Sequence, residues 1–535
     1  MTTRQYTCYS PAPAPAPAPA PAADGSTAAS TSNRWPPLHI PVSAAANYTV
    51  EPSGSVQDKN RRSAQLVEAG DFEQARHFYP RVLNAHIHPL VAAFFRMDNA
   101  QVAARYGHLN PAVDESKLHD LLGVQPQHFA WAGSDLLSVT NGSGQRQMVV
   151  VETNSCPSGQ KSMPPLQDSD ASSGYRAVAG AVLGALLADA DVDGDLAVVY
   201  DKNAMEASGY AATLAAESSE QVWLVEHYDG DPDPPVAWIA DTMHVRDGSG
   251  TWHAIRGCLR YVTQRPWNRI PLRTRTRMLN PVVACLAGGR NKTMAARAYE
   301  QLNVELQPHQ LRVRVPETVY NVALADVPEW VRRMGGRAVI KNPYSNAGQG
   351  VWTVATPSDL DAFMRLDQPY AKFVVQSLVG NAEWSSSTRG GCLYHVGTVP
   401  DRRNRVYVCD LRVMVAATSS GFRPVSIYAR RARDPLARVL DAGTSSWNML
   451  GTNLSVRNSD GSWSTDADRL VLMDCKDFNQ LGIGIDDLID AYVQTVLSVI
   501  AIDKMAQRLL RPDGAFDYAL FRELNPDDAL LDELD

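Results

Sequence analysis

A β-hairpin is the local structure that this sequence predicts most clearly. Two extended runs, FAWAGSDLLSVT and QRQMVVVETN, flank the turn-forming residues Asn-Gly-Ser-Gly at 141–144. A turn centred between Ser143 and Gly144 pairs Thr140 with Gln147. This register fixes which side chains of the two strands share a face, because paired residues project from the same side.

The predicted register brings three oxygen-bearing side chains together. Asp135 lies opposite Glu152, and Asn154 follows two residues later on the same face. Facing carboxylates repel each other unless a cation lies between them, and carboxylate and amide oxygens suit Mg²⁺. Residues of similar type recur near the C-terminus, at Asp517, Glu523 and Asn525. Their stretch, FDYALFRELN, has apolar spacing that could equally be helical, so this second set remains an alternative metal site.

Composition narrows the class of protein. A chain of 535 residues is long enough for two to four domains, and its net charge of −8 does not favour a nucleic-acid partner. Its 7 cysteines show no C-x-x-C pairing, which argues against a disulfide framework and a zinc ribbon. The first residues lack an apolar signal segment, and the apolar helical run at 177–188 is too short to span a bilayer. We therefore expect a cytoplasmic protein without a membrane partner.

The rest of the chain divides by pattern. The Pro-Ala repeat near the N-terminus predicts a disordered tail, and 60–122 has helical periodicity. His86 and His88 lack a third ligand, which favours a structural role. GDLAVVYD, a helix and QVWLVEHY form a β-α-β pattern typical of a small α/β domain with a parallel sheet. A long amphipathic helix is predicted at 486–510.

A lysine followed by a glycine-containing turn is a candidate phosphate site. Lys341 ends the apolar strand RAVIK and precedes NPYSNAGQG. A strand lysine can pair with phosphate oxygens, and Gly348 and Gly350 allow the turn to approach them closely. An exposed lysine beside a hairpin is the ordinary alternative for such a pattern.

The order of several short motifs gives that lysine a context. GGRNK, VPET, AVIKNPYSNAGQGV, FVVQSLVGNAE and DLRVMV follow one another over about 290–415. In this order the sequence resembles the ATP-grasp superfamily. The resemblance implies that Lys292 and Lys341 hold nucleotide phosphates, that Gln376, Ser377 and Leu378 line adenine, and that Glu383 binds ribose. It also implies a lid that includes Ser345, Gly348, Gln349 and Gly350. Arg412, with Arg430 or Arg431, would face the transferring phosphoryl group.

The metal strands suggest a permuted member of that superfamily. In the usual order of the family, the strands that carry the metal ligands come last in the chain, which favours the C-terminal set. However, GSDLL followed by VVVETNSCPSG matches the family's pattern for these strands better. Eukaryotic glutathione synthetases and glutathionylspermidine synthetases are similar in placing E-x-N early and the lysines late. Asn346, however, stands where some permuted relatives carry a glutamate. The resemblance therefore implies metal binding by Asp135, Glu152 and Asn154.

The resemblance also implies a domain order and an α/β ATP-grasp fold. The expected parts are a disordered tail at 1–35, a helical region with the metal hairpin at 36–190, a Rossmann-like domain at 191–285, a small lobe at 286–370 and a large lobe at 371–535. The implied activity is ATP- and Mg²⁺-dependent ligation of a small carboxylate to an amine or thiol through an acyl phosphate, with release of ADP and phosphate. A nucleotide-binding scaffold and a small-molecule kinase remain alternatives, and the oligomeric state is left open, a homodimer included.

Overall fold

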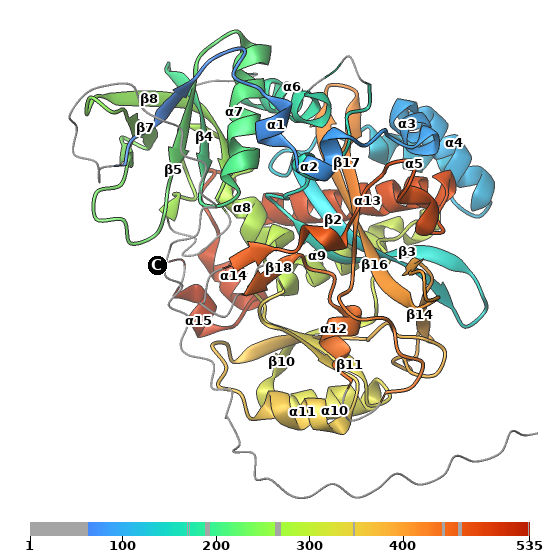
Figure 1. Ribbon diagram of the computed structural model, residues 1–535. Coiled ribbons are helices and arrows are strands. Elements are labelled where there is room, and N and C mark those ends of the chain that lie inside the picture. The colour runs from blue at the N-terminus through green and yellow to red at the C-terminus, as the bar shows by residue number, and fades with distance from the viewer. Residues whose placement is uncertain are drawn as a thin grey trace, which may run out of the picture. The chain divides into compact units, whose positions relative to one another are not determined.

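The computed structural model describes residues 62–167, 170, 172–187, 193–262, 269–345, 348–440, 444–457, 463–532 and 534. All of these belong to one compact unit. The predicted tail at 1–35 lies outside the described residues. The α/β class expected from the sequence is confirmed, because helices pack on three main β-sheets (Figure 1).

The first sheet contains the predicted β-α-β unit. Its strands, in order, are β1 (Gln65–Val67), β5 (Val222–Glu226), β4 (Asp195–Tyr200), β8 (Trp252–Tyr261), β7 (Thr242–Arg246) and β6 (Val236–Ile239), with β9 (Arg277–Leu279) on β8. β4 is parallel to β5 and β8, whereas β1, β6 and β7 pair antiparallel. The sheet is thus mixed, not purely parallel as expected. Helix α7 (Ala204–Ser218) connects β4 to β5 and packs on both, beside α6 (Ser173–Leu187).

The second sheet is antiparallel and carries Lys341. Its order is β10 (Thr318–Ala323), β13 (Lys372–Gln376), β11 (Ala338–Lys341) and β12 (Val351–Val354). Helices α10 (Val327–Arg333) and α11 (Pro357–Met364) lie along this sheet (Figure 1). Val331, Phe363 and Phe373 form part of their shared core. Because β11 pairs with both β12 and β13, its C-terminal lysine lies between Val351 of β12 and Val374 of β13.

The third sheet contains the predicted metal hairpin. Its order is β14 (Leu393–His395), β2 (Trp131–Asn141), β16 (Val406–Thr418), β17 (Gly421–Arg431) and β20 (Leu470–Val471), with β3 (Arg146–Asn154) on β2 and β15 (Thr398–Pro400) on β16. The long helix α13 (Ile485–Arg508) packs on β2, β3 and β16, as well as on α9 (Lys292–Leu306). The helix predicted at 486–510 is therefore confirmed, and its burial on several elements explains its long apolar stretch.

The hairpin register differs from the prediction at the turn but agrees at the acids. Thr140 pairs with Arg146, one residue short of the predicted Gln147. A register shift then occurs between the pairs of Asp135 and Leu136, which leaves Val151 as an extra residue and restores the pairing of Asp135 with Glu152. The predicted pairing of Asp135 with Glu152 is confirmed, because the bulge compensates for the one-residue error at the turn.

Short helices account for most of the N-terminal described region. They are α1 (Gln74–His77), α2 (Pro80–Leu83), α3 (Pro89–Arg96), α4 (Asn99–Leu109) and α5 (Glu115–Leu122). His88 is the N-cap of α3, and its Nδ1 accepts a hydrogen bond from the backbone N–H of Leu90, a structural role as expected. The remaining α-helices and strands are α8 (Val282–Ala284), α12 (Ser446–Leu450), α14 (Tyr518–Leu524), α15 (Asp528–Leu531) and the hairpin of β18 (Ser455–Arg457) and β19 (Trp463–Thr465).

Across the described segments, no helix combines the length and apolar character needed to cross a bilayer.

Candidate active site

A cleft of about 230 Å³ lies where β3, α9 and the second sheet meet. Its lining includes four residues predicted from the sequence, namely Glu152, Lys292, Lys341 and Gln376. Each comes from a different segment of the chain. The cleft is also lined by the apolar side chains Val150, Val315 and Val374 and by the polar residues Arg290, Glu300, Glu317 and Thr318. This mixture of an apolar wall and convergent charges is typical of a small-molecule site.

Lys341 is buried at the cleft wall. Its Nζ donates to Gln376 Oε1 at 2.8 Å and to the carbonyl oxygen of Val151, the bulged residue of β3, at 3.2 Å. Burial lowers the pKa of Lys341 to about 8; the carboxylate of Glu152 opposes this shift, whereas the neighbouring ammonium of Lys292 adds to it. The hairpin bulge and the strand lysine are therefore in direct contact, although far apart in sequence.

Lys292 begins α9 and faces the same acid. Its Nζ lies 3.5 Å from Glu152 Oε1 and donates to Ser345 Oγ at 2.9 Å and to the Ser345 carbonyl oxygen at 3.1 Å. The backbone N–H of Lys292 also donates to Pro343 O. Lys292 thus links the hairpin acid to the loop that follows Lys341.

The predicted lid loop is described in part, since Asn346 and Ala347 lie outside the described residues. Gly348 and Gly350 have φ of +74° and +63°, a region that favours glycine. A Cβ at Gly350 would lie 2.5 Å from Asn342 Nδ2, so this glycine is required by space as well as by backbone conformation. Gln349 lies in the turn that leads into β12.

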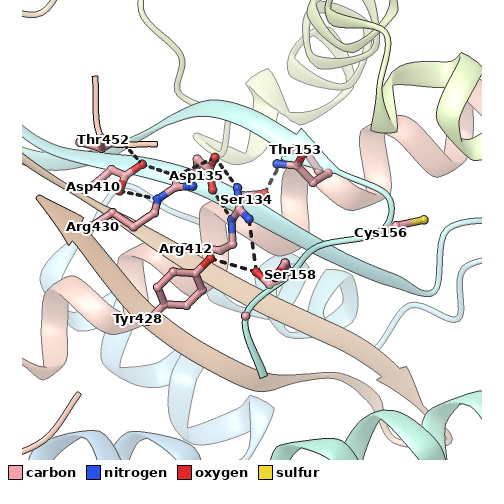
Figure 2. Close-up of polar contacts among 12 residues, drawn as sticks. Ser134, Asp135, Thr153, Cys156, Ser158, Asp410, Arg412, Tyr428, Arg430 and Thr452 are labelled. Carbon is pink, nitrogen blue, oxygen red and sulfur yellow. Dashed lines mark hydrogen bonds and ion pairs between the residues drawn. The ribbon is translucent and has the colours of Figure 1, made fainter. Parts of the chain in front are cut away.

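Asp135 lies between two arginines of the neighbouring strands (Figure 2). Arg412 donates to it through Nε at 2.6 Å and Nη2 at 2.8 Å, and Arg430 Nη2 lies 2.8 Å from its Oδ2. Arg430 is also paired with Asp410, which accepts from Thr452 Oγ1 at 2.8 Å. Burial alone would raise the pKa of Asp135, but the two guanidinium groups outweigh it and hold this pKa well below its usual range.

The register of β17 separates Arg430 from Arg431. Arg430 pairs with Asp410, whose side chain shares the face of Arg412 and Asp135, whereas Arg431 pairs with Cys409. Arg431 lies over the ring of Tyr407, with 4.8 Å between the guanidinium carbon and the ring centroid. Because side chains alternate along a strand, Arg430 and not Arg431 joins the arginine group beside Asp135.

The three predicted metal ligands differ in how many acceptor positions they retain. Glu152 lines the cleft, and its side chain is 29% exposed. Asp135 accepts three bonds from arginines, one fewer than the four or so that a carboxylate can accept. Asn154 Oδ1 accepts from Arg290 Nη1 at 3.0 Å, and its buried Nδ2 has no partner among the described residues. Carboxylate and amide oxygens are the donor types that Mg²⁺ prefers, but each of the three is paired with a lysine or arginine, and of the three only Glu152 lines the cleft. Within the described ranges, no three His, Cys, Asp or Glu residues gather in a cluster that could hold a metal.

Of the residues predicted to bind adenine and ribose, one lines the cleft and the others do not. Gln376 lines the cleft, but Ser377 and Leu378 do not. The backbone N–H of Ser377 donates to Glu317 O, and that of Leu378 donates to Ser386 Oγ, so these groups are already paired. Glu383 is 51% exposed and pairs with Arg438 at 3.3 Å. Glu317 lines the cleft, whereas Glu383 does not.

The alternative metal set near the C-terminus belongs to a helix. Asp517 caps α14 and accepts from the backbone N–H of Leu520 at 2.9 Å. Glu523 is exposed on the same helix, and the buried Asn525 accepts from Asn291 Nδ2 at 3.0 Å. The helical interpretation of FDYALFRELN is therefore confirmed, with Asp517 at the N-cap and Asn525 at the C-cap of α14.

The sequence-based prediction missed several residues of the cleft. Arg290 lies two positions before Lys292 in GGRNK and binds Asn154, so this motif could have identified it. Thr318 accepts from Gln376 Nε2 at 2.8 Å, and it belongs to the VPET segment, for which the sequence predicted no binding role. Glu317 lies in the same segment. Tyr299 and Glu300, on α9, carried no recognisable signal.

Comparison with known proteins yields matches in structure alone. No family model and no curated protein sequence matches the chain. A proposed gamma-glutamylcysteine synthetase from Methylobacillus flagellatus is 12% identical, with a TM-score of 0.42 over 79% of this chain and 99% of that chain. A glutathione synthetase-like effector from Globodera pallida is 10% identical, with a TM-score of 0.36 over 66% and 85%. A RimK domain ATP-grasp protein from Sphaerobacter thermophilus is 14% identical, with a TM-score of 0.26 over 44% and 90%. The name of the Sphaerobacter protein contains the term ATP-grasp.

Proposed function

We propose that the protein is an ATP-dependent ligase of the ATP-grasp type that joins a carboxylate to an amine. The observation that carries this proposal is the meeting of Glu152, Lys292, Lys341 and Gln376 in one cleft. These residues lie far apart in the sequence, and Lys292 and Glu152 also form an ion pair at 3.5 Å.

The two lysines supply the positive charge that a triphosphate requires. Lys292 and Lys341 now donate to neutral oxygens of Ser345, Gln376 and Val151. Phosphate oxygens are charged acceptors and would form stronger bonds with the same ammonium groups. Phosphoryl transfer depends mainly on positioning and charge neutralisation, so the lysines need no further chemistry.

Arg412 and Arg430, which do not line the cleft, would supply charge on a second side of the site. Arg412 and Arg430 are held in fixed orientation by Asp135, and this arrangement costs no reorganisation during the reaction. They would stabilise the charge on the phosphoryl group as it transfers. Mg²⁺ bound by Asp135, Glu152 and Asn154 would neutralise phosphate oxygens on the hairpin side.

The proposed reaction has two steps. An oxygen of the substrate carboxylate attacks the γ-phosphorus of ATP, the bond from that phosphorus to the oxygen of ADP breaks, and an acyl phosphate forms. The amine nitrogen then attacks the acyl carbon, phosphate leaves with the bonding electron pair, and the amine loses a proton to solvent. The loop that contains Gly348 and Gly350 would exclude water, which would otherwise hydrolyse the acyl phosphate.

The test is product analysis with single-site variants. The purified protein is incubated with ATP, Mg²⁺ and pools of amino acids or polyamines, and products are identified by mass spectrometry. We expect a condensed product with stoichiometric ADP and phosphate, lost in Lys341→Met and Glu152→Gln. Lys504→Met is the matched control, because Lys504 is 48% exposed in an ion pair with Glu305. A stable phosphoester would identify a kinase, and tight ATP binding without turnover would identify a scaffold; either result contradicts the proposal.

A further inference from the structure

A buried carboxylate outside the cleft is bound to a loop that follows the metal hairpin. Glu206 lies in the first turn of α7 and is fully buried. Its Oε1 accepts from the backbone N–H groups of Gly159 and Gln160, both at 2.7 Å. Its Oε2 accepts from Ser158 Oγ at 2.7 Å and from Tyr261 OH at 2.8 Å. The carboxylate therefore holds three successive residues of one loop.

The opposite side of this loop contacts the arginine group of the proposed site. The carbonyl oxygen of Ser158 accepts from Arg412 Nη1 at 3.2 Å and from Tyr428 OH at 2.9 Å, and Figure 2 shows these three residues together. The next carbonyl oxygen, that of Gly159, accepts from Ser426 Oγ at 3.2 Å. A continuous set of hydrogen bonds thus runs from Glu206 through Ser158 to Arg412.

Close packing leaves this loop little freedom to move. A Cβ at Gly159 would lie 2.5 Å from Cε1 of Tyr428 and 2.8 Å from Sδ of Met414. Because the loop lies directly between Glu206 and these β16–β17 side chains, a displacement on the Glu206 side must be transmitted to the Ser158 carbonyl. Arg412 would then lose one of the acceptors that orient it.

Glu206 accepts every hydrogen bond that it shares with the loop and with Tyr261, and a lysine lies near it. A carboxylate can accept all of the bonds from the loop and from Tyr261, and Lys161 Nζ lies 3.7 Å from Oε2. A glutamine has nearly the same shape but presents an NH₂ group. If that group faces the two backbone N–H groups, donors oppose donors; if it faces Ser158 Oγ and Tyr261 OH, both hydroxyls must turn from donors into acceptors. In either orientation Lys161 loses its anionic neighbour, and we expect the loop to shift.

We infer that Glu206 is a positioning residue for Arg412 and acts through residues 158–160. This inference rests on the proposed function, since Arg412 must stabilise the transferring phosphoryl group for its orientation to affect turnover. The expected consequence is a change in kcat and not in ATP binding, because the lysines and Gln376 of the cleft lie on other elements. Helix α7, which packs on the first sheet, thereby orients an arginine for a reaction between the second and third sheets.

The test is a double-mutant cycle in the full-length enzyme. Glu206→Gln should lower kcat about tenfold to a hundredfold, with the KM for ATP within about twofold of wild type. In the Arg412→Lys background, Glu206→Gln should have little further effect on kcat, because both changes disturb one unit. Asp195→Asn is the control for loss of a polar contact in the first sheet, since Asp195 accepts from Trp223 Nε1 at 2.8 Å away from the loop.

Each outcome separates the inference from the function on which it rests. Equal activity in Glu206→Gln and Asp195→Asn, or full additivity with Arg412→Lys, would overturn the positioning role. Absence of ATP turnover in the wild-type protein would instead overturn the proposed function. If Glu206→Gln does not fold, Ser158→Ala enters the same cycle, since it removes one bond to Glu206 and leaves the backbone acceptor in place.

Discussion

Replacing Asp135 by asparagine should destabilise the protein through two buried arginines. Within the part of the chain that the structure describes, Arg412 has Asp135 as its one carboxylate partner, whereas Arg430 keeps Asp410. The side chains of Asp135 and Arg412 are 10% and 13% exposed, so the remaining guanidinium charge would be poorly solvated. Breaking a buried ion pair from one side costs about 3–5 kcal/mol. The new amide would also direct an NH₂ group toward a guanidinium donor, which places the expected loss in the upper part of that range.

An exposed pair of the same chemistry provides the matched control. Arg105 donates to Asp486 through Nε at 2.8 Å and Nη2 at 2.9 Å, but the two side chains are 44% and 41% exposed. Asp486→Asn should therefore cost only about 0–1 kcal/mol. Urea unfolding followed by tryptophan fluorescence gives both free energies, provided that the variants share the wild-type m-value.

The pH dependence of that difference has a definite sign. The pKa of Asp135 is depressed in the folded protein, so its stabilising contribution is present above the unfolded value near 4 and declines as pH falls below it. The difference between wild type and Asp135→Asn should shrink in that acidic range. A loss of stability in Asp135→Asn no larger than in Asp486→Asn at neutral pH would refute the reasoning.

Three further outcomes are expected. ATP affinity should fall as pH rises through about 8, because burial lowers the pKa of Lys341 to about 8 and this lysine must be protonated to bind phosphate. Titration calorimetry should show that ATP affinity depends less on pH in Lys341→Arg than in wild type. Gly350→Ala should lower kcat about tenfold or more with a smaller effect on folding, because its Cβ would lie 2.5 Å from Asn342 Nδ2; wild-type turnover would contradict this. Glu523→Ala should leave ATP turnover and its Mg²⁺ dependence unchanged, in contrast to Glu152→Gln, and a loss of Mg²⁺ dependence would move the metal site to the C-terminus.

The fold could be predicted where local patterns determine the element. The hairpin, the β-α-β unit and the long helix can each be recognised from hydrophobic periodicity or from turn-forming residues. The bulge at Val151 could not be predicted, because it depends on contacts such as the bond from Val150 N–H to Arg314 O. The edge strand β1 was missed because it is only three residues long.

Order along the chain identified some of the residues that line the cleft. Lys292, Lys341 and Gln376 were identified from the spacing of motifs, and the choice between Arg430 and Arg431 needed only a strand register. Glu383 illustrates the limit, because its exposed pairing with Arg438 depends on how a loop folds. Glu206 lies in a helix whose sequence carries no catalytic motif, so its contact with the loop at 158–160 required the structure.

Labelling with an ATP acyl phosphate tests the central claim most directly. Such a reagent transfers its acyl group to a lysine that lies beside bound phosphates, and peptide mass spectrometry then identifies the modified residue. If a triphosphate lies between the hairpin acids and the two lysines, Lys292 and Lys341 should be modified, and excess ATP with Mg²⁺ should suppress both signals. Modification confined to other lysines, with Lys292 and Lys341 unlabelled, would contradict the account.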